Sequence, residues 1–146
     1  MNGEYSSIEI DCARAADAPA VAALAVELGY PDPGIAARLA RVLEDPEQVV
    51  LAARSCGRLL GWAHVRVSRQ LLRDPYADLT GLVVSEGARG QGIGSALLGE
   101  VENWARQRSL LCVRLRSNVT RKRAHGFYLR EGYEEQKESK AFVKNL

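Results

Sequence analysis

The chain has 146 residues, of which 47% are hydrophobic and 26% charged, a composition that fits one globular domain spanning residues 1–146. The formal net charge of +2 gives no compositional reason to expect binding to nucleic acid or to a membrane surface. The first residues lack a basic segment followed by an apolar one, and no apolar run is long enough to span a bilayer, so we expect a cytoplasmic protein.

The first part of the chain predicts a strand and two helices. Residues 8–14 alternate like a half-buried strand. Asp17 is a candidate N-cap for a helix that carries Pro19 in its first turn. Apolar residues from Ile35 onward mark a second, shorter helix that ends near Pro46.

The middle of the chain predicts three strands and a long helix. Residues 48–54 and 58–67 are typical of a hairpin, because a short polar turn separates two apolar runs. Residues 77–84 form the next predicted strand. From Ile93 onward, apolar residues recur at helical spacing.

The last third predicts a strand over residues 110–117 and a helix that begins near Arg121 and is closed by Gly132. The segments 132–136 and 139–146 then suggest a terminal hairpin.

The cysteines and histidines argue against a disulfide framework or a metal site. Cys12, Cys56 and Cys112 are odd in number and lack CxxC spacing, so we expect reduced thiols. The two histidines, His64 and His125, are far apart in sequence. We therefore predict no metal centre.

Glycine is concentrated between the strand that ends at Val84 and the helix that follows. The positions are Gly87, Gly90, Gly92 and Gly94. A glycine-rich loop at a helix start lets backbone N–H groups approach an anion, and the positive end of the helix dipole favours that anion. No acidic residue stands in this first turn, and Arg89 lies beside it. A purely structural turn remains the alternative.

Two common phosphate motifs do not fit this loop. A P-loop requires GxxxxGK[ST], and no Lys-Ser or Lys-Thr pair stands at the helix start. A dinucleotide fingerprint requires GxGxxG, of which only the first half is present, and the loop is not in an opening βαβ unit.

The segment RGQGIG, residues 89–94, resembles the [Q/R]-x-x-G-x-[G/A] loop of the GNAT family of N-acetyltransferases. A second segment, SNVTRKRAHGFYLREGY over residues 117–133, resembles the other CoA-side motif of that family. There an Asn follows a strand, and A-x-x-F-Y-x-x-x-G-[FY] follows on a helix. The resemblance covers the whole chain and is strongest over residues 77–133.

The resemblance implies an α/β (mixed α+β) fold and an activity. The fold is a mixed, mostly antiparallel sheet of six to seven strands with about four helices, splayed between the strands of residues 77–84 and 110–117 to hold CoA. The activity is transfer of acetyl from acetyl-CoA to a primary amine of a small molecule or protein, by direct attack. A non-catalytic CoA-binding sensor is the alternative, and a homodimer is left open. The implied CoA-binding residues are Leu82, Val83, Val84, Arg89, Gly90, Gln91, Gly92, Ile93, Gly94, Ser95, Asn118, Arg121, Arg123 and Tyr128.

Amine acetylation needs loss of a proton from the amine, a donor for the oxyanion and an acid near the leaving thiolate. Tyr128 is the predicted acid, unless it is only part of an aromatic core. Many family members carry a Glu where this chain has Thr80, so a water relay or another residue must serve as the base, and Asp78 and His64 are the candidate residues. On the acceptor side the resemblance implies roles for three residues: Tyr30, Asp32 and Thr80.

Overall fold

The computed structural model describes residues 7–146 and divides the chain into two compact units, one ending at Leu115 and one beginning at Arg116. The first unit contains β1 (Glu9–Cys12), α1 (Ala18–Glu27), α2 (Ile35–Glu44), β2 (Gln48–Ser55), β3 (Arg58–Ser68), β4 (Tyr76–Val84), α3 (Ile93–Gln107) and β5 (Val113–Leu115). The second contains α4 (Lys122–Arg130). Within residues 7–146, no helix combines the length and apolar character needed to cross a membrane.

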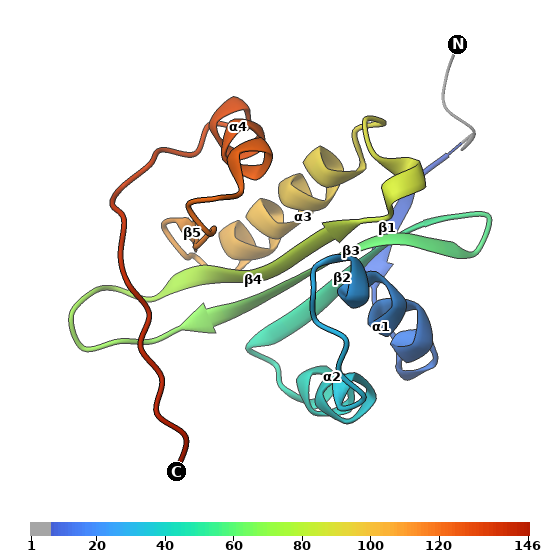
Figure 1. The fold of residues 1–146 in the computed structure, drawn as a ribbon, viewed down its shortest axis with the longest axis horizontal. Coiled ribbons are helices and arrows are strands. Elements are labelled where there is room, and N and C mark those ends of the chain that lie inside the picture. The colour runs from blue at the N-terminus through green and yellow to red at the C-terminus, as the bar shows by residue number, and fades with distance from the viewer. Residues whose placement is uncertain (1–6) are drawn as a thin grey trace. The chain divides into compact units, whose positions relative to one another are not determined.

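The sheet of the first unit has the order β1-β2-β3-β4-β5 and is antiparallel except for the β4–β5 pair (Figure 1). Helices α1 and α2 cover one face, and α3 covers the other. Both faces of the central strands are therefore buried, which explains why β2 and β3 are apolar almost throughout rather than alternating. The mixed α/β class is confirmed.

Two glycines make room for close contacts within the sheet. A methyl group on Gly81 would lie 2.9 Å from Cζ3 of Trp62, and one on Gly61 would lie 2.8 Å from the Val83 carbonyl oxygen. Trp62 is buried and donates its indole N–H to the Val21 carbonyl in α1 at 3.2 Å. The Trp62 hydrogen bond thus fastens α1 to the sheet.

The predicted strand count and the terminal hairpin were wrong. The described residues form five strands, and residues 134–146 contain neither helix nor strand. This tail is rich in Glu and Lys, and its apolar residues Phe142 and Val143 are about nine-tenths exposed, at 91% and 90%. Without an apolar face to bury, nothing specifies strand pairing there.

The second unit contains α4, which ends as the sequence predicts. Gly132 adopts a φ of 91°, and its amide donates to the Leu129 carbonyl at 3.1 Å. The Tyr133 amide donates to the Tyr128 carbonyl at 3.0 Å. The Tyr128 ring contacts Phe127 and Tyr133 edge-on, with centroid distances of 5.2 and 5.9 Å. A glycine C-cap thus sets the packing of this aromatic cluster.

Arg54 is the buried cation of the first unit. Its guanidinium binds both Asp17 carboxylate oxygens, at 2.7 and 2.6 Å, and Asp11 at 2.9 Å. The side chains of Arg54 and Asp17 are only 9% and 11% exposed. This network ties β1 and β2 to the start of α1, and it holds the pKa of Asp17 at about 2, mainly through the Arg54 hydrogen bonds.

Asp17→Asn should destabilise the fold by about 3 kcal/mol at pH 7, because it leaves Arg54 buried with its main partner gone. The pKa of Asp17 is lowered from 3.8 to about 2 on folding. The associated stabilisation, about 2 kcal/mol, is present above pH 4 and disappears as the pH falls towards 2. Urea unfolding of both proteins at several pH values measures this.

The matched control is Asp32→Asn, which weakens an exposed ion pair with Arg38 on the same unit. Its urea midpoint at pH 7 should stay close to that of the unmodified chain. Equal midpoints for Asp17→Asn and the unmodified chain would contradict a structural role for the Arg54 network.

Candidate functional site

The glycine-rich loop joins β4 to the N-terminus of α3, as the sequence predicts. Gly90 and Gly92 both have a φ of 81°, which disfavours any other L-residue. A Cβ atom on either would meet no atom within 4 Å, so the space in front of their backbones is open. Gly92 is the N-cap of α3, and within the described chain no side chain caps this helix. The loop is thus built to present backbone N–H groups outward.

The first turn of α3 carries no acidic residue, and Ile93 is buried beneath it. Ile93 anchors the loop to the core together with Leu97 and Leu98. A 15-residue helix delivers the full positive end of its dipole to this point. The chemistry of the loop therefore favours an anion.

Strand β4 loses its β5 partner midway, as the predicted splay requires. The β4–β5 pairs end at Leu79–Leu115, and among the residues described none forms a strand pair with residues 80–84 on that side. The Ser85 amide donates to the Leu60 carbonyl in β3 at 2.7 Å. Because antiparallel backbone groups alternate between two edges, those of Leu82 and Val84 face the unpaired edge.

Arg89 does not stand unpaired beside the loop. Its Nε donates to the Val84 carbonyl at 3.1 Å, and its Nη2 lies 3.6 Å from Glu27 Oε1 at the end of α1. Glu27 also accepts the Glu86 amide at 2.9 Å. Any anion held by Arg89 would therefore compete with Glu27. Glu27 was not predicted, because its contact with Glu86 links residues 59 positions apart.

His64 and Thr80, both singled out in the sequence, are in direct contact. His64 Nδ1 lies 2.7 Å from the Thr80 hydroxyl oxygen, and His64 Nε2 lies 2.8 Å from Gln48 Oε1. Burial is the main cause of a lowered His64 pKa; Arg66 adds to the effect, and Asp78 opposes it. Asp78 itself pairs with Arg66 at 3.3 Å. Thus the two candidate bases differ: one is a half-buried imidazole and the other an ion-paired carboxylate.

Gln48 and Asp45 were missed by sequence reasoning. Gln48 Nε2 donates to Asp45 Oδ2 at 2.9 Å, which orients the Gln48 carbonyl towards His64. These residues precede or begin a predicted strand and belong to no motif. Only the β2–β3 register, which places Val50 opposite His64, brings Gln48 within reach.

The second unit holds the remaining predicted CoA-side residues. The Asn118 side-chain oxygen accepts from the Thr120 amide at 2.9 Å and hydroxyl at 2.8 Å, so only its NH₂ group remains to bind a ligand. Arg121 is the N-cap of α4, and Arg123 lies in its first turn. Burial raises the pKa of the Tyr128 phenol, so this phenol keeps its proton at neutral pH.

The two predicted acceptor residues of the α1–α2 loop have different surroundings. Tyr30 is 67% exposed. Asp32 accepts from the Gly34 amide at 2.7 Å and pairs with Arg38 at 2.9 Å, interactions that lower its pKa. Asp32 is thus already engaged in shaping the start of α2.

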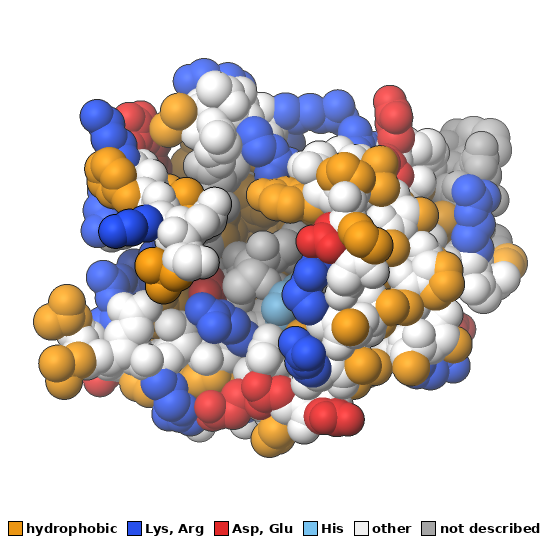
Figure 2. All heavy atoms as spheres, turned by 60° about the horizontal axis from the view of Figure 1, so that its bottom comes forward, with side chains coloured by type: hydrophobic (Ala, Val, Ile, Leu, Met, Phe, Trp, Pro, Cys, Tyr) orange, Lys and Arg blue, Asp and Glu red, His pale blue; other side chains and the backbone are white. Residues whose placement is uncertain are grey.

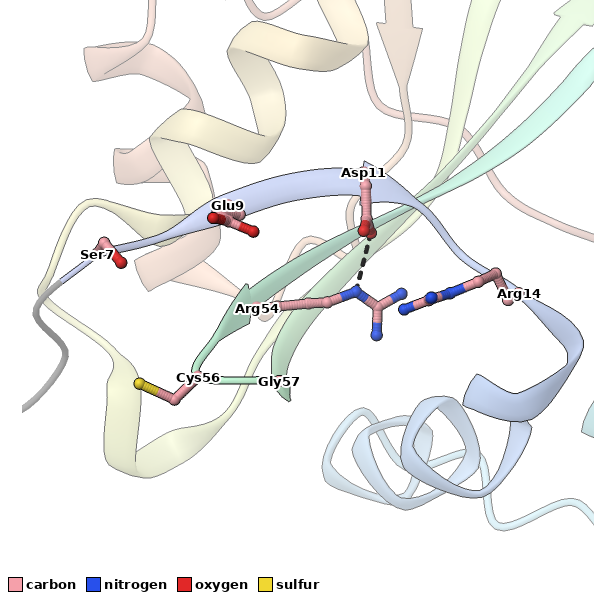
Figure 3. A pocket seen from close by; sticks show the side chains of 7 residues that line it. All are labelled: Ser7, Glu9, Asp11, Arg14, Arg54, Cys56 and Gly57. Atoms are coloured by element: carbon pink, nitrogen blue, oxygen red, sulfur yellow. Dashed lines mark hydrogen bonds and ion pairs between the residues drawn. The ribbon is translucent and has the colours of Figure 1, made fainter.

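A hollow of about 380 Å³ lies elsewhere, at the end of the β2–β3 hairpin. Ser7, Glu9, Asp11, Arg14, Arg54, Cys56 and Gly57 line it (Figure 3). Its buried cation, Arg54, is already bound by Asp11 and Asp17. None of its residues belongs to the glycine loop or to the predicted CoA-binding set. We therefore assign the hollow no part in the site.

Charge on the surface is mixed. On the face drawn in Figure 2, hydrophobic, basic and acidic side chains are interspersed, and no sign of charge dominates. This agrees with a net charge of +2 and directs attention to local groups rather than to a surface field.

Curated relatives match about two thirds of the chain. One is an aminoalkylphosphonate N-acetyltransferase of Salmonella typhimurium, 36% identical over 94 residues, which are 64% of this chain and 61% of that protein. Another is an uncharacterised N-acetyltransferase of Mycobacterium tuberculosis, 34% identical over 99 residues, 66% of this chain and 60% of that protein. The chain thus spans about three fifths of the length of these relatives.

Solved structures share the fold at low sequence identity. An aminoglycoside acetyltransferase, AAC(6')-Iy, in complex with a bisubstrate analogue, superposes with a TM-score of 0.85 at 18% identity, covering 97% of this chain and 100% of that one. A transcriptional regulator from Bacillus halodurans also gives 0.85, at 20% identity, over 94% and 100% of the two chains.

A family model also matches most of the chain. The model described as the acetyltransferase (GNAT) family matches residues 14–133, which include β4, the glycine loop and α4. Because this match covers most of the chain, the protein belongs to the GNAT acetyltransferase family.

Proposed function

We propose that this protein transfers the acetyl group of acetyl-CoA to a primary amine, through direct attack in a ternary complex. The observation that carries the proposal is the combination of an unpaired β4 edge with the glycine loop at the start of α3. Membership of the GNAT family supports the same reaction.

The residues of the loop fit the pyrophosphate of CoA. The backbones of Gly90 and Gly92 have open space before them, the helix dipole points the right way, and no carboxylate stands in the first turn of α3. Arg89 adds a cation once it exchanges Glu27 for the ligand.

The unpaired edge of β4 suits the amide groups of the pantetheine arm, which would add to the sheet like a further strand. Leu82 and Val84 supply the backbone donors and acceptors on that edge. A Val84 N–H directed at the thioester carbonyl would stabilise the developing oxyanion. Acetyl-CoA itself supplies the activated acyl group.

The second unit supplies further proposed roles. The NH₂ group of Asn118 is the donor left for the CoA arm. Arg121 and Arg123 begin α4 without an acidic partner in its first turn, an arrangement suited to the 3′-phosphate. Tyr128, whose pKa is raised by burial, is the proposed acid for the departing thiolate.

We propose a small amine as the acceptor. The support is the curated relative named for aminoalkylphosphonates and the shared fold with aminoglycoside acetyltransferases. Tyr30 offers an exposed ring at the acceptor side. Asp32 contributes less than the sequence suggests, because Arg38 already neutralises it.

Incubation with acetyl-CoA and a panel of amines should release free thiol in proportion to acetylated product. The panel includes aminomethylphosphonate, sisomicin and a lysine peptide. Turnover above the rate without amine is expected for at least one small amine. Tight CoA binding without turnover on a broad panel would instead favour the non-catalytic sensor.

Gly92→Asp should weaken CoA affinity by about 100-fold or more, because it places a carboxylate where the pyrophosphate binds. Isothermal titration with CoA measures the change. Unchanged affinity would overturn the pyrophosphate assignment.

The control for backbone strain is Gly57→Asp in the β2–β3 turn. Gly57 has a φ of 77° and equally open space, so the variant suffers similar strain. It should unfold slightly more easily and bind CoA normally.

Tyr128→Phe should lower kcat at least about tenfold with little change in CoA affinity, because only the phenolic proton is removed. Tyr133→Phe removes a hydroxyl from the neighbouring ring of the same cluster and serves as control. An unchanged kcat in Tyr128→Phe would show that Tyr128 has only a packing role.

A further inference from the structure

Four polar side chains form a continuous hydrogen-bonded chain across β2, β3 and β4. Asp45 accepts from Gln48 at 2.9 Å, Gln48 contacts His64 Nε2 at 2.8 Å, and His64 Nδ1 contacts the Thr80 hydroxyl at 2.7 Å. Gln48 leads β2, His64 lies in β3, and Thr80 lies in β4. This hydrogen-bonded chain thus runs from the exposed Thr80 to the half-buried His64 and on to Gln48 and Asp45.

The hydrogen-bonded chain has a defined donor-to-acceptor direction. Because the Gln48 NH₂ group donates to Asp45, its carbonyl oxygen faces His64 and must accept the Nε2–H. His64 Nδ1 is then the bare nitrogen, and it accepts the Thr80 hydroxyl. The His64 carbonyl is a longer alternative acceptor for that hydroxyl, at 3.2 Å. When the hydroxyl proton is donated to Nδ1, the lone pairs of the Thr80 oxygen remain as acceptors.

Thr80 lies at the point where the sheet opens. The β3–β4 register passes from His64–Gly81 to Val65–Leu79, so Thr80 is the extra residue of a bulge. Thr80 is also the first residue of β4 beyond the last β4–β5 pair, and it is exposed. Thr80 thus stands where the unpaired segment of β4 begins, and its hydroxyl contacts His64 in the neighbouring strand β3.

His64 is held as a neutral base. Burial lowers its pKa below the ordinary 6.5, Arg66 acts in the same direction, and Asp78 opposes both. The carboxylate of Asp45 reaches the imidazole only through Gln48, and hydrogen bonds from Gln48 and Glu47 keep the Asp45 pKa low. At neutral pH the imidazole therefore retains a lone pair on Nδ1.

We propose, on the basis of the proposed acetyl transfer, that Thr80 and His64 form the proton relay that serves as its general base. As the amine nitrogen bonds to the acyl carbon, the carbonyl π electrons move to oxygen, the N–H bond breaks and its electron pair stays on nitrogen. The oxyanion then re-forms the carbonyl, the C–S bond breaks, and the thiolate takes the proton of Tyr128. The proton released from the amine passes to Thr80 Oγ1, and the Thr80 hydroxyl proton passes to His64 Nδ1. The imidazolium keeps its Nε2–H on Gln48 and later returns the extra proton to solvent.

The relay replaces the strand carboxylate that many GNAT members carry. A hydroxyl alone is too weak a base to take this proton, but a hydroxyl that transfers its own proton to a neutral imidazole is not. Of the two bases predicted from the sequence, His64 is therefore assigned the role, and Asp78 tunes it through Arg66.

The test compares four variants in steady-state kinetics with acetyl-CoA and the best amine of the panel. Thr80→Val should lower kcat about tenfold or more at constant KM for acetyl-CoA, and Thr80→Ser should restore it to within about threefold. His64→Gln should abolish the acidic limb of the kcat–pH profile. Gln48→Glu should move that limb to higher pH, because a carboxylate at Nε2 favours the imidazolium.

Nitrogen-15 NMR gives a readout independent of turnover, since the chain has only His64 and His125 to assign. We expect the Nε2–H tautomer and a His64 pKa below 6.5, and we expect Gln48→Glu to raise this pKa. In an active enzyme, an Nδ1–H tautomer, an unchanged kcat in Thr80→Val or an unchanged pH profile in His64→Gln would overturn the relay alone. A correct NMR signature with no acetylation of any amine would overturn the proposed function, and the relay with it.

Discussion

The site depends on one constraint on backbone pairing: β4 must bond to β3 along its whole length while β5 leaves it after Leu79. A strand with one satisfied edge and one free edge normally invites aggregation. Here the free segment is short, and Arg89 covers part of it by binding the Val84 carbonyl. The unsatisfied backbone groups that remain are the feature that a pantetheine arm would use.

The same strand explains why a threonine can stand where a carboxylate is common. The bulge at Thr80 turns its hydroxyl towards His64, and the β2–β3 register places Gln48 behind the imidazole. A carboxylate at Thr80 would be an independent base and would raise the His64 pKa. With threonine at this position, the proposed base is the His64 imidazole in β3, whose pKa is lowered by burial and by Arg66. The location of the base thus moves from one strand to its neighbour.

Local signals predicted the parts of this protein that are locally determined. The Gly132 helix end, the Cys56-Gly57 turn and the loop before Ile93 all follow from short-range backbone chemistry. Asp17 stands at the predicted start of α1, but its carboxylate makes no cap hydrogen bond there and binds Arg54 instead. Long-range contacts were not predictable in this way. The pairing of Glu27 with Arg89 depends on how separate elements pack together, and so does the hydrogen-bonded chain from Asp45 to Thr80. The terminal hairpin failed because the apolar residues of the tail, Phe142 and Val143, have no face to bury.

The positive φ angles of Gly90 and Gly92 also have a thermodynamic consequence. The loop already has its bent shape, fixed below by Ile93 in the core, so a ligand need not order it on arrival. If the loop binds CoA as proposed, the binding energy that a flexible loop would lose to conformational entropy would be retained as affinity. Gly90 and Gly92 thus make the unfolded chain more flexible, yet in the folded loop they adopt a bent backbone that other residues would disfavour.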